Sequence, residues 1–124
     1  MTILARIGWQ LDIYPQVWPA SEFAFLQERA RVSALKRLGI DYTSKEQALD
    51  FITKLITNVC ACSAATICLI DSSMCYIKST SGGPSNVTKV DRRLSISMYC
   101  LVPLKPEVLV VEDLTADARY SSAL

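Results

Sequence analysis

The apolar residues in the first third of the chain recur at helical spacing. Between Glu22 and Leu38, one stripe repeats every three or four positions and comprises Phe23, Leu26, Ala30, Ala34 and Leu38. A second stripe lies on nearly the opposite side of the same helix and comprises Phe25, Val32 and Leu35. One stripe can face the domain while the other stays free for a partner helix. Phe25, Val32 and Leu35 are therefore the candidate seam of a homodimer formed through the 22–38 helix.

A second helix is predicted to begin at Thr43, because Thr43 and Glu46 have the spacing of a capping box. Its apolar residues form one stripe, which we expect to be buried: Leu49, Ile52, Ile56 and Val59. Asp50 and Lys54 are four positions apart and should form an exposed ion pair. The helix is expected to give way to a loop at 58–63.

The pattern then changes to apolar runs of strand length. Residues 64–70 form a nearly continuous apolar run, and a second run at 74–79 follows a short polar break, which predicts an antiparallel hairpin. A two-residue turn would place Cys68 and Cys75 diagonally on one face of the sheet, whereas a turn one residue longer would separate them. We therefore predict no disulfide between them.

The rest of the chain carries weaker signals. Three further elements are predicted: a loop at 81–85, a short helix at 95–102 and a short strand at 108–111. Asp113 is expected to cap the turn that follows this strand. Residues 1–20 should form an irregular or partly extended leader before a single domain at 21–124. The fold class is therefore α/β, more specifically α+β, with an antiparallel sheet flanked by helices.

The order of these elements, together with five sequence segments, resembles a GAF domain, a small-molecule-binding and dimerising module of signalling proteins. The first segment, 28–40, looks like an ERLAALRRLGI-type helix, and 50–55 is similar to the second helix of the same group. Residues 66–71 and 76–79 look like its LVD and WFKS strands, and 110–120 is similar to its VVxDxxADxRF motif. The five segments follow the family's order.

The resemblance implies a ligand pocket between one face of the sheet and the segment 85–102. The positions that it carries over as pocket lining are Thr66, Cys68, Tyr76, Ser97 and Tyr99. Relatives often have a cysteine and a histidine where this chain has Ser97 and Tyr99, so covalent attachment of a tetrapyrrole is not implied. We expect no cofactor. The expected ligand is a small molecule, and the residues do not identify its chemical class.

The family also has two strands beyond the last matched segment, in the middle of its sheet between the hairpin and the 108–111 strand. We expect this chain's sheet to lack them, which would leave the 64–70 strand with an unpaired edge. Two explanations stay open. The chain is a piece of a longer signalling protein, or a partner supplies the strands.

Composition and charge narrow the function further. Hydrophobic residues make up 51% and charged residues 20% of the 124 residues, which is typical of a globular chain. A formal net charge of +1 gives no general basic field for nucleic acid. Two local basic clusters are expected to be solvated faces: Arg29, Arg31, Lys36 and Arg37 in one, and Lys89, Arg92 and Arg93 in the other.

Membrane and secretory signals are weak. The longest uncharged stretch, between Lys54 and Asp71, is too short to span a bilayer. Residues 1–20 include two prolines and an aspartate and make a poor signal peptide. We therefore expect a cytoplasmic protein that neither crosses nor contacts a membrane.

The chain has five cysteines and no histidine, which gives little basis for a metal site or for redox catalysis. Because the number of cysteines is odd, we expect free thiols and no disulfide framework. Zinc sites usually need four ligands in paired spacing, and no CxxC pair occurs, so we also expect no metal site. No hydrolase, phosphate-loop or metalloprotease motif is present.

We expect a non-catalytic regulatory module that acts through dimerisation and small-molecule sensing. The alternatives are a thiol-based redox enzyme of the GAF methionine-sulfoxide-reductase kind and a fragment with no function of its own.

Overall fold

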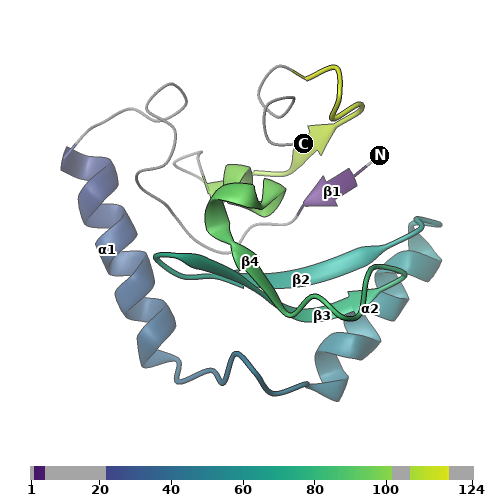
Figure 1. The fold of residues 1–124 in the computed structure, drawn as a ribbon, viewed down its shortest axis with the longest axis horizontal. Coiled ribbons are helices and arrows are strands. Elements are labelled where there is room, and N and C mark those ends of the chain that lie inside the picture. The colour runs from purple at the N-terminus through teal and green to yellow at the C-terminus, as the bar shows by residue number, and fades with distance from the viewer. Residues whose placement is uncertain (1, 5–21, 102–106, 118–124) are drawn as a thin grey trace.

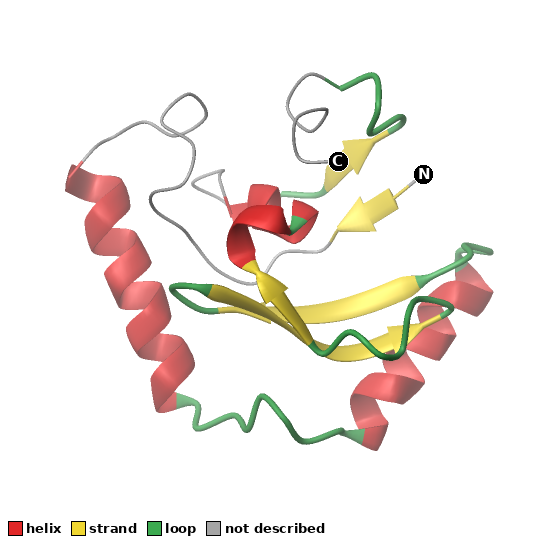
Figure 2. Ribbon diagram, viewed as in Figure 1, coloured by secondary structure: helices red, strands yellow, loops and turns green. Residues whose placement is uncertain are grey.

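The computed structural model describes residues 2–4, 22–101 and 107–117, with side chains from Leu26 onward. Its elements, in chain order, are β1 (Thr2–Leu4), α1 (Glu22–Arg37), α2 (Gln47–Val59), β2 (Ala65–Ile70), β3 (Met74–Ser81), β4 (Lys89–Asp91), the 3₁₀ helices η1 (Arg92–Leu94) and η2 (Ile96–Leu101), and β5 (Leu109–Val111). Helices and antiparallel sheet confirm the α+β class. The β2–β3–β4 sheet crosses the middle of the molecule, with α1 and α2 at opposite ends (Figure 1). Figure 2 shows the loop that joins the two helices.

β2 and β3 form the hairpin that the apolar runs predict. Its turn has the two-residue loop 72–73, closed by a hydrogen bond from the Asp71 amide to the Met74 carbonyl oxygen (2.9 Å). The Asp71 carboxylate accepts hydrogen bonds from the amides of Ser73 and Met74, at 2.7 Å each. The polar break forms a tight turn because it begins with an aspartate, whose carboxylate can accept hydrogen bonds from the backbone amides that follow.

The turn length fixes the register of the hairpin. Ile70 pairs with Cys75, so Cys68, two positions before Ile70, lies on the same face of the sheet as Cys75. The predicted diagonal placement of these two cysteines is confirmed, and both are free thiols. β4 pairs antiparallel with the other edge of β3, and none of the described residues pairs with the outer edge of β2.

A β-bulge interrupts the hairpin at Lys78. The register shifts between Ile67 and Cys68, which leaves Lys78 without a partner on β2. The Lys78 side chain is buried, and its Nζ donates to the carbonyl oxygens of Asp41 and Ser44, at 2.7 Å each. The bulge thus ties the loop between the two helices to the sheet.

The capping box predicted at the start of α2 is wrong. The helix begins at Gln47, and Glu46, at the N-cap position, makes no side-chain cap bond. Glu46 Oε1 instead lies 3.1 Å from Lys78 Nζ. The hydroxyl and the amide of Thr43 donate to Asp41 Oδ1, at 2.7 and 2.8 Å. An aspartate two residues upstream therefore competes with the helix for Thr43 and keeps it in a turn.

α2 packs its polar side against the sheet. The hydroxyl of Thr53, a fully buried residue, lies 2.9 Å from Ser79 Oγ, which donates to Asp50 Oδ1 at 2.6 Å. One turn further along the helix, the hydroxyls of Thr57 and Ser81 lie 3.4 Å apart. Buried hydroxyls require hydrogen-bond partners, so the serines of β3 select the hydroxyl-bearing side of α2 as its inner face.

Two predictions about α2 are therefore wrong. The stripe expected to be buried is largely exposed: Ile52, Ile56 and Val59 point outward, and Leu49 is half-buried. Asp50 accepts from Ser79 on the sheet and is not in an exposed pair with Lys54. The apolar periodicity identified the helix, but the side it buries was set by β3.

α1 keeps its predicted extent but turns a different stripe inward. Glu28, Arg31 and Leu35, at positions i, i+3 and i+7, are all buried. The stripe expected to face the domain is exposed instead, with Leu26 at 54% and Leu38 at 68% of full exposure. The buried polar pair on the helix finds partners at the tip of the hairpin, and this docking sets the rotation of α1.

The core consists of two small apolar clusters, and η2 contributes to both. The first contains Met98, Tyr99 and Val111, with Leu109 and Leu114 packed against it. The second contains Ile70, Cys75 and Leu101, with Cys68 and Val90 packed against it. η2 is the short helix predicted at 95–102, here in 3₁₀ form, and it lies between the two sheets (Figure 1).

The smaller sheet joins β1 to β5. The two strands are antiparallel, with Leu4 opposite Leu109. β5 confirms the strand predicted at 108–111, and Asp113 caps the following turn by accepting from the Thr115 amide at 2.8 Å. Of the leader expected to be irregular or partly extended, residues 2–4 are extended and 5–21 lie outside the described residues.

Candidate functional site

The residues expected to line a pocket do not meet at one place. Cys68 and Ser97 do approach each other, with the Ser97 hydroxyl 4.0 Å from Cys68 Sγ. Thr66 is exposed, and its hydroxyl lies 3.1 Å from that of Thr80 across the hairpin. Tyr99 is buried in the first core cluster, where it packs with Met98 and Val111.

Tyr76 lies on the other side of the sheet from Cys68. It follows Cys75 in β3, and neighbouring residues of a strand point to opposite faces. Its ring stacks on that of Tyr42, with centroids 4.4 Å apart and an interplanar angle of 12°. Tyr42 belongs to the loop between the two helices, so the stacked pair packs this loop against the face of the sheet that carries Tyr76.

The seam expected on α1 is only partly accessible. Leu35 is buried within the protomer, on the same helix face as Arg31, and Val32 is half-buried. The side chain of Phe25 lies outside the described part of the chain. A buried leucine is not available to a partner helix, so the predicted seam cannot act as a whole.

Three cysteines gather between the hairpin and η2. The Cys68 and Cys75 thiols hydrogen-bond to each other, and Ser95 Oγ donates to Cys75 Sγ at 3.4 Å. The bond from Cys68, helped by that from Ser95, lowers the pKa of Cys75 to about 7. The same bond and burial raise the pKa of Cys68. Cys75 and Cys100 are both buried.

This thiol cluster is better suited to packing than to redox turnover. A catalytic thiolate needs access to its substrate as well as a low pKa. Cys75 has the low pKa but only 1% of its surface is exposed. Within the described residues no three His, Cys, Asp or Glu side chains are placed to hold a metal ion.

The outer face of α2 carries five of the ten large apolar side chains that the described residues expose. Five side chains make it up: Phe51, Ile52, Leu55, Ile56 and Val59. Phe51 and Val59, at its two ends, are 68% and 75% exposed. The inner side of the same helix is satisfied by hydroxyl contacts to β3, so α2 is amphipathic with its apolar side outward. Such a patch is typical of a contact surface.

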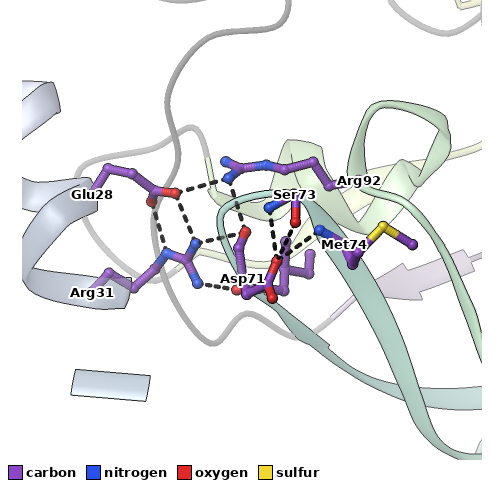
Figure 3. A network of polar contacts seen from close by, with 7 residues as sticks. Glu28, Arg31, Asp71, Ser73, Met74 and Arg92 are labelled. Atoms are coloured by element: carbon purple, nitrogen blue, oxygen red, sulfur yellow. Dashed lines mark hydrogen bonds and ion pairs between the residues drawn. The ribbon is translucent and has the colours of Figure 1, made fainter. Parts of the chain in front are cut away.

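A buried ionic network holds α1 to the tip of the hairpin (Figure 3). Glu28 accepts two hydrogen bonds from Arg31, from Nε and from Nη2, at 2.8 Å each. Arg31 also donates through Nη1 to the Ile70 carbonyl oxygen and through Nη2 to that of Asp71, the latter at 3.3 Å. Bidentate pairing of this kind fixes both position and orientation.

Arg92 joins the same network from η1. Its Nη1 donates to Glu28 Oε1 at 3.0 Å and to the Asp71 carbonyl oxygen at 2.9 Å. Burial lowers the pKa of Arg92 from its ordinary value, and Glu28 opposes this shift. Two guanidinium groups thus converge on one carboxylate (Figure 3).

The prediction that both basic clusters are solvated faces is wrong for Arg31 and Arg92, which are buried. The available signal was the spacing of Glu28 and Arg31, three positions apart on a predicted helix, which permits an ion pair. Nothing local indicates Arg92, since its partner Glu28 lies 64 positions earlier in the chain. The other basic residues of the two clusters that the structure shows as exposed are Arg29, Lys36, Arg37, Lys89 and Arg93.

Comparison with known proteins adds no family. The chain matches none of the protein-family models against which it was compared, and no curated protein matches it. In the described part of the structure, no helix combines the length and the apolar character that crossing a bilayer requires.

Proposed function

We propose that this chain is a non-catalytic protein-interaction module of the GAF type, which pairs with a second copy of itself through the outer face of α2. The observation that carries the proposal is the exposed apolar stripe of Phe51, Leu55 and Val59 on a helix whose inner side is already satisfied. The five segments that resemble the GAF family support a regulatory role. Small-molecule sensing has weaker support, because the residues carried over as pocket lining do not converge.

The energy of covering this face fits a reversible dimer. Its five side chains are each between 39% and 75% exposed. Burying a fully exposed apolar side chain contributes about 1.5–3 kcal/mol, so covering the face contributes roughly 4–8 kcal/mol on each copy. Association itself costs roughly 4–15 kcal/mol. For two copies the gain, roughly 8–16 kcal/mol, is of the same size as this cost, so the face supports a reversible dimer that forms at high protein concentration.

The stripe is also self-complementary. Phe51, Leu55 and Val59 are spaced by four residues along one side of the helix. In an antiparallel pair related by a two-fold axis at Leu55, the two Leu55 side chains meet. Phe51 of one copy then lies against Val59 of the other, so that a large side chain faces a small one at both ends.

Replacing Leu55 with glutamate should raise the dimer dissociation constant at least about 100-fold, because the symmetry brings two carboxylates into one apolar contact. Sedimentation equilibrium measures the change, with circular dichroism to verify that the variant stays folded. The matched control is Leu26→Glu, which places the same charge on an exposed apolar position of α1. Dissociation by Leu26→Glu but not by Leu55→Glu would move the interface to α1, and a wild-type protein that stays monomeric at high concentration would refute the proposal.

A further inference from the structure

Arg92 is the largest side chain that the described part of the protein buries fully, at 1% exposure. Its Nη1 donates two hydrogen bonds, one to Glu28 Oε1 and one to the Asp71 carbonyl oxygen. Its Nε and Nη2 are also buried, yet neither has a hydrogen-bond acceptor among the described residues. A buried donor without an acceptor costs about 1–3 kcal/mol, and more when it carries charge. An acceptor is therefore favoured at this edge of the guanidinium.

The geometry of that edge specifies the acceptor. Nε and Nη2 of an arginine point the same way and form a fork that matches two oxygens of one carboxylate or phosphate. Arg31 shows this use in the same network, since its Nε and Nη2 bind the two oxygens of Glu28. Arg92 presents the same pair of atoms, so the matching group is a second oxyanion.

The charge of the network favours the same ligand. Glu28 is the only carboxylate among the described residues that contacts Arg31 and Arg92 with its side-chain oxygens. The nearby Asp71 carboxylate is committed to the amides of Ser73 and Met74 in the turn. One carboxylate shared between two buried guanidinium groups leaves positive charge that an anion would balance.

We propose that the Nε–Nη2 edge of Arg92, at the start of η1, is a binding site for a small oxyanion, a phosphate or a carboxylate. The proposal is independent of dimerisation, because the site does not involve the outer face of α2.

The oxyanion has two sources that experiment can separate. One is a free anion from solution. The other is the chain itself, because two acidic side chains lie outside those that the structure describes, Asp12 and Glu22. We assign the site to a free anion, and the Asp12→Asn and Glu22→Gln variants test the internal alternative.

The experiment is a thermal-shift titration with sodium phosphate, and separately with sodium acetate, at ionic strength held constant with chloride. A free-anion site predicts a saturable rise in Tm of roughly 3–10 °C for the wild type. Arg92→Lys keeps the charge but removes the fork, so its Tm should not respond. Asp12→Asn and Glu22→Gln should each respond as the wild type does. In case Arg92→Lys does not fold, the arginine Nε–H region of a ¹H–¹⁵N NMR spectrum of the wild type supplies a second readout, in which one resonance should shift saturably with anion.

Three results would overturn the proposal. One is a Tm that rises equally with chloride, which shows a general salt effect. Another is the absence of any saturable change in both Tm and the arginine Nε–H resonances. The third is a response that appears only in Asp12→Asn or only in Glu22→Gln, together with a lower starting Tm of that variant, which would assign the fork to the chain's own carboxylate.

Discussion

Replacing Glu28 with alanine should destabilise the protein by about 3–5 kcal/mol, because it removes the carboxylate that two buried guanidinium groups share. Arg31 would lose both hydrogen bonds that it donates to Glu28, and Arg92 would keep the carbonyl oxygen of Asp71 as its one acceptor among the described residues. α1 would then lose its ion pair with Arg92 of η1, while Arg31 would keep its hydrogen bonds to the carbonyl oxygens of Ile70 and Asp71. Urea unfolding followed by circular dichroism measures the loss, provided that the slope of the transition stays unchanged.

The matched control is Glu46→Ala. Glu46 also pairs with a buried cation, Lys78, but its side chain is 49% exposed and Lys78 retains two carbonyl acceptors. Solvent screening limits its contribution to below about 1 kcal/mol. If Glu28→Ala prevents folding altogether, Glu28→Gln keeps one acceptor oxygen and should give an intermediate loss. Equal effects of Glu28→Ala and Glu46→Ala would contradict a buried network that fixes α1.

Replacing Gly82 with alanine should cost about 2–4 kcal/mol, because the position combines backbone strain with a steric overlap. Gly82 has a φ of +73°, in the left-handed region that favours glycine. A Cβ there would overlap the carbonyl oxygen of Ser63 and lie 3.1 Å from the carbonyl carbon. These atoms belong to the backbone, so the loop after β3 and the segment before β2 would have to separate.

Gly39 provides the control, because its φ is +60° but a Cβ there would meet nothing within 4 Å. Gly39→Ala should cost only about 1–2 kcal/mol, the strain alone. Chemical unfolding of the two variants side by side isolates the overlap at Gly82. If the two losses were the same, the close approach of the 81–85 loop to Ser63 would be refuted.

The elements that depend on short-range signals could be predicted well. The extent of α1 follows from its continuous helical spacing, and the hairpin follows from two apolar runs around an aspartate-led turn. The relative placement of Cys68 and Cys75 depends on the turn length, which the sequence left open, and the observed two-residue turn decides it. These features depend on residues a few positions apart, which a single sequence displays directly.

Predictions about which face is buried failed, and the reason is physical. An apolar stripe is expected to face the core, yet α2 turns Thr53 and Thr57 inward because β3 presents Ser79 and Ser81 to them. The inner face of a helix depends on the surface it meets, which lies elsewhere in the sequence. A threonine repeat at helical spacing opposite a strand with alternate serines was the signal that indicated this contact.

The ionic network shows the same limit at longer range. Arg92 adjoins the exposed Arg93 and differs from it in no local feature, but only Arg92 reaches Glu28. Neither residue was among the candidate site residues, because a basic cluster on its own is typical of a solvated face. The pairing of β1 with β5, near opposite ends of the described chain, was also beyond local signals.

The measurement that tests the central claim most directly is a disulfide cross-link at the proposed two-fold axis. Leu55→Cys is introduced in a Cys60→Ser/Cys62→Ser background, which removes the cysteines nearest to the end of α2. If two copies pair through this face, mild oxidation should convert most of the variant to a covalent dimer on a non-reducing gel, and Leu26→Cys in the same background should stay monomeric. No cross-link through Leu55→Cys, or an equal yield from Leu26→Cys, would contradict pairing through the outer face of α2.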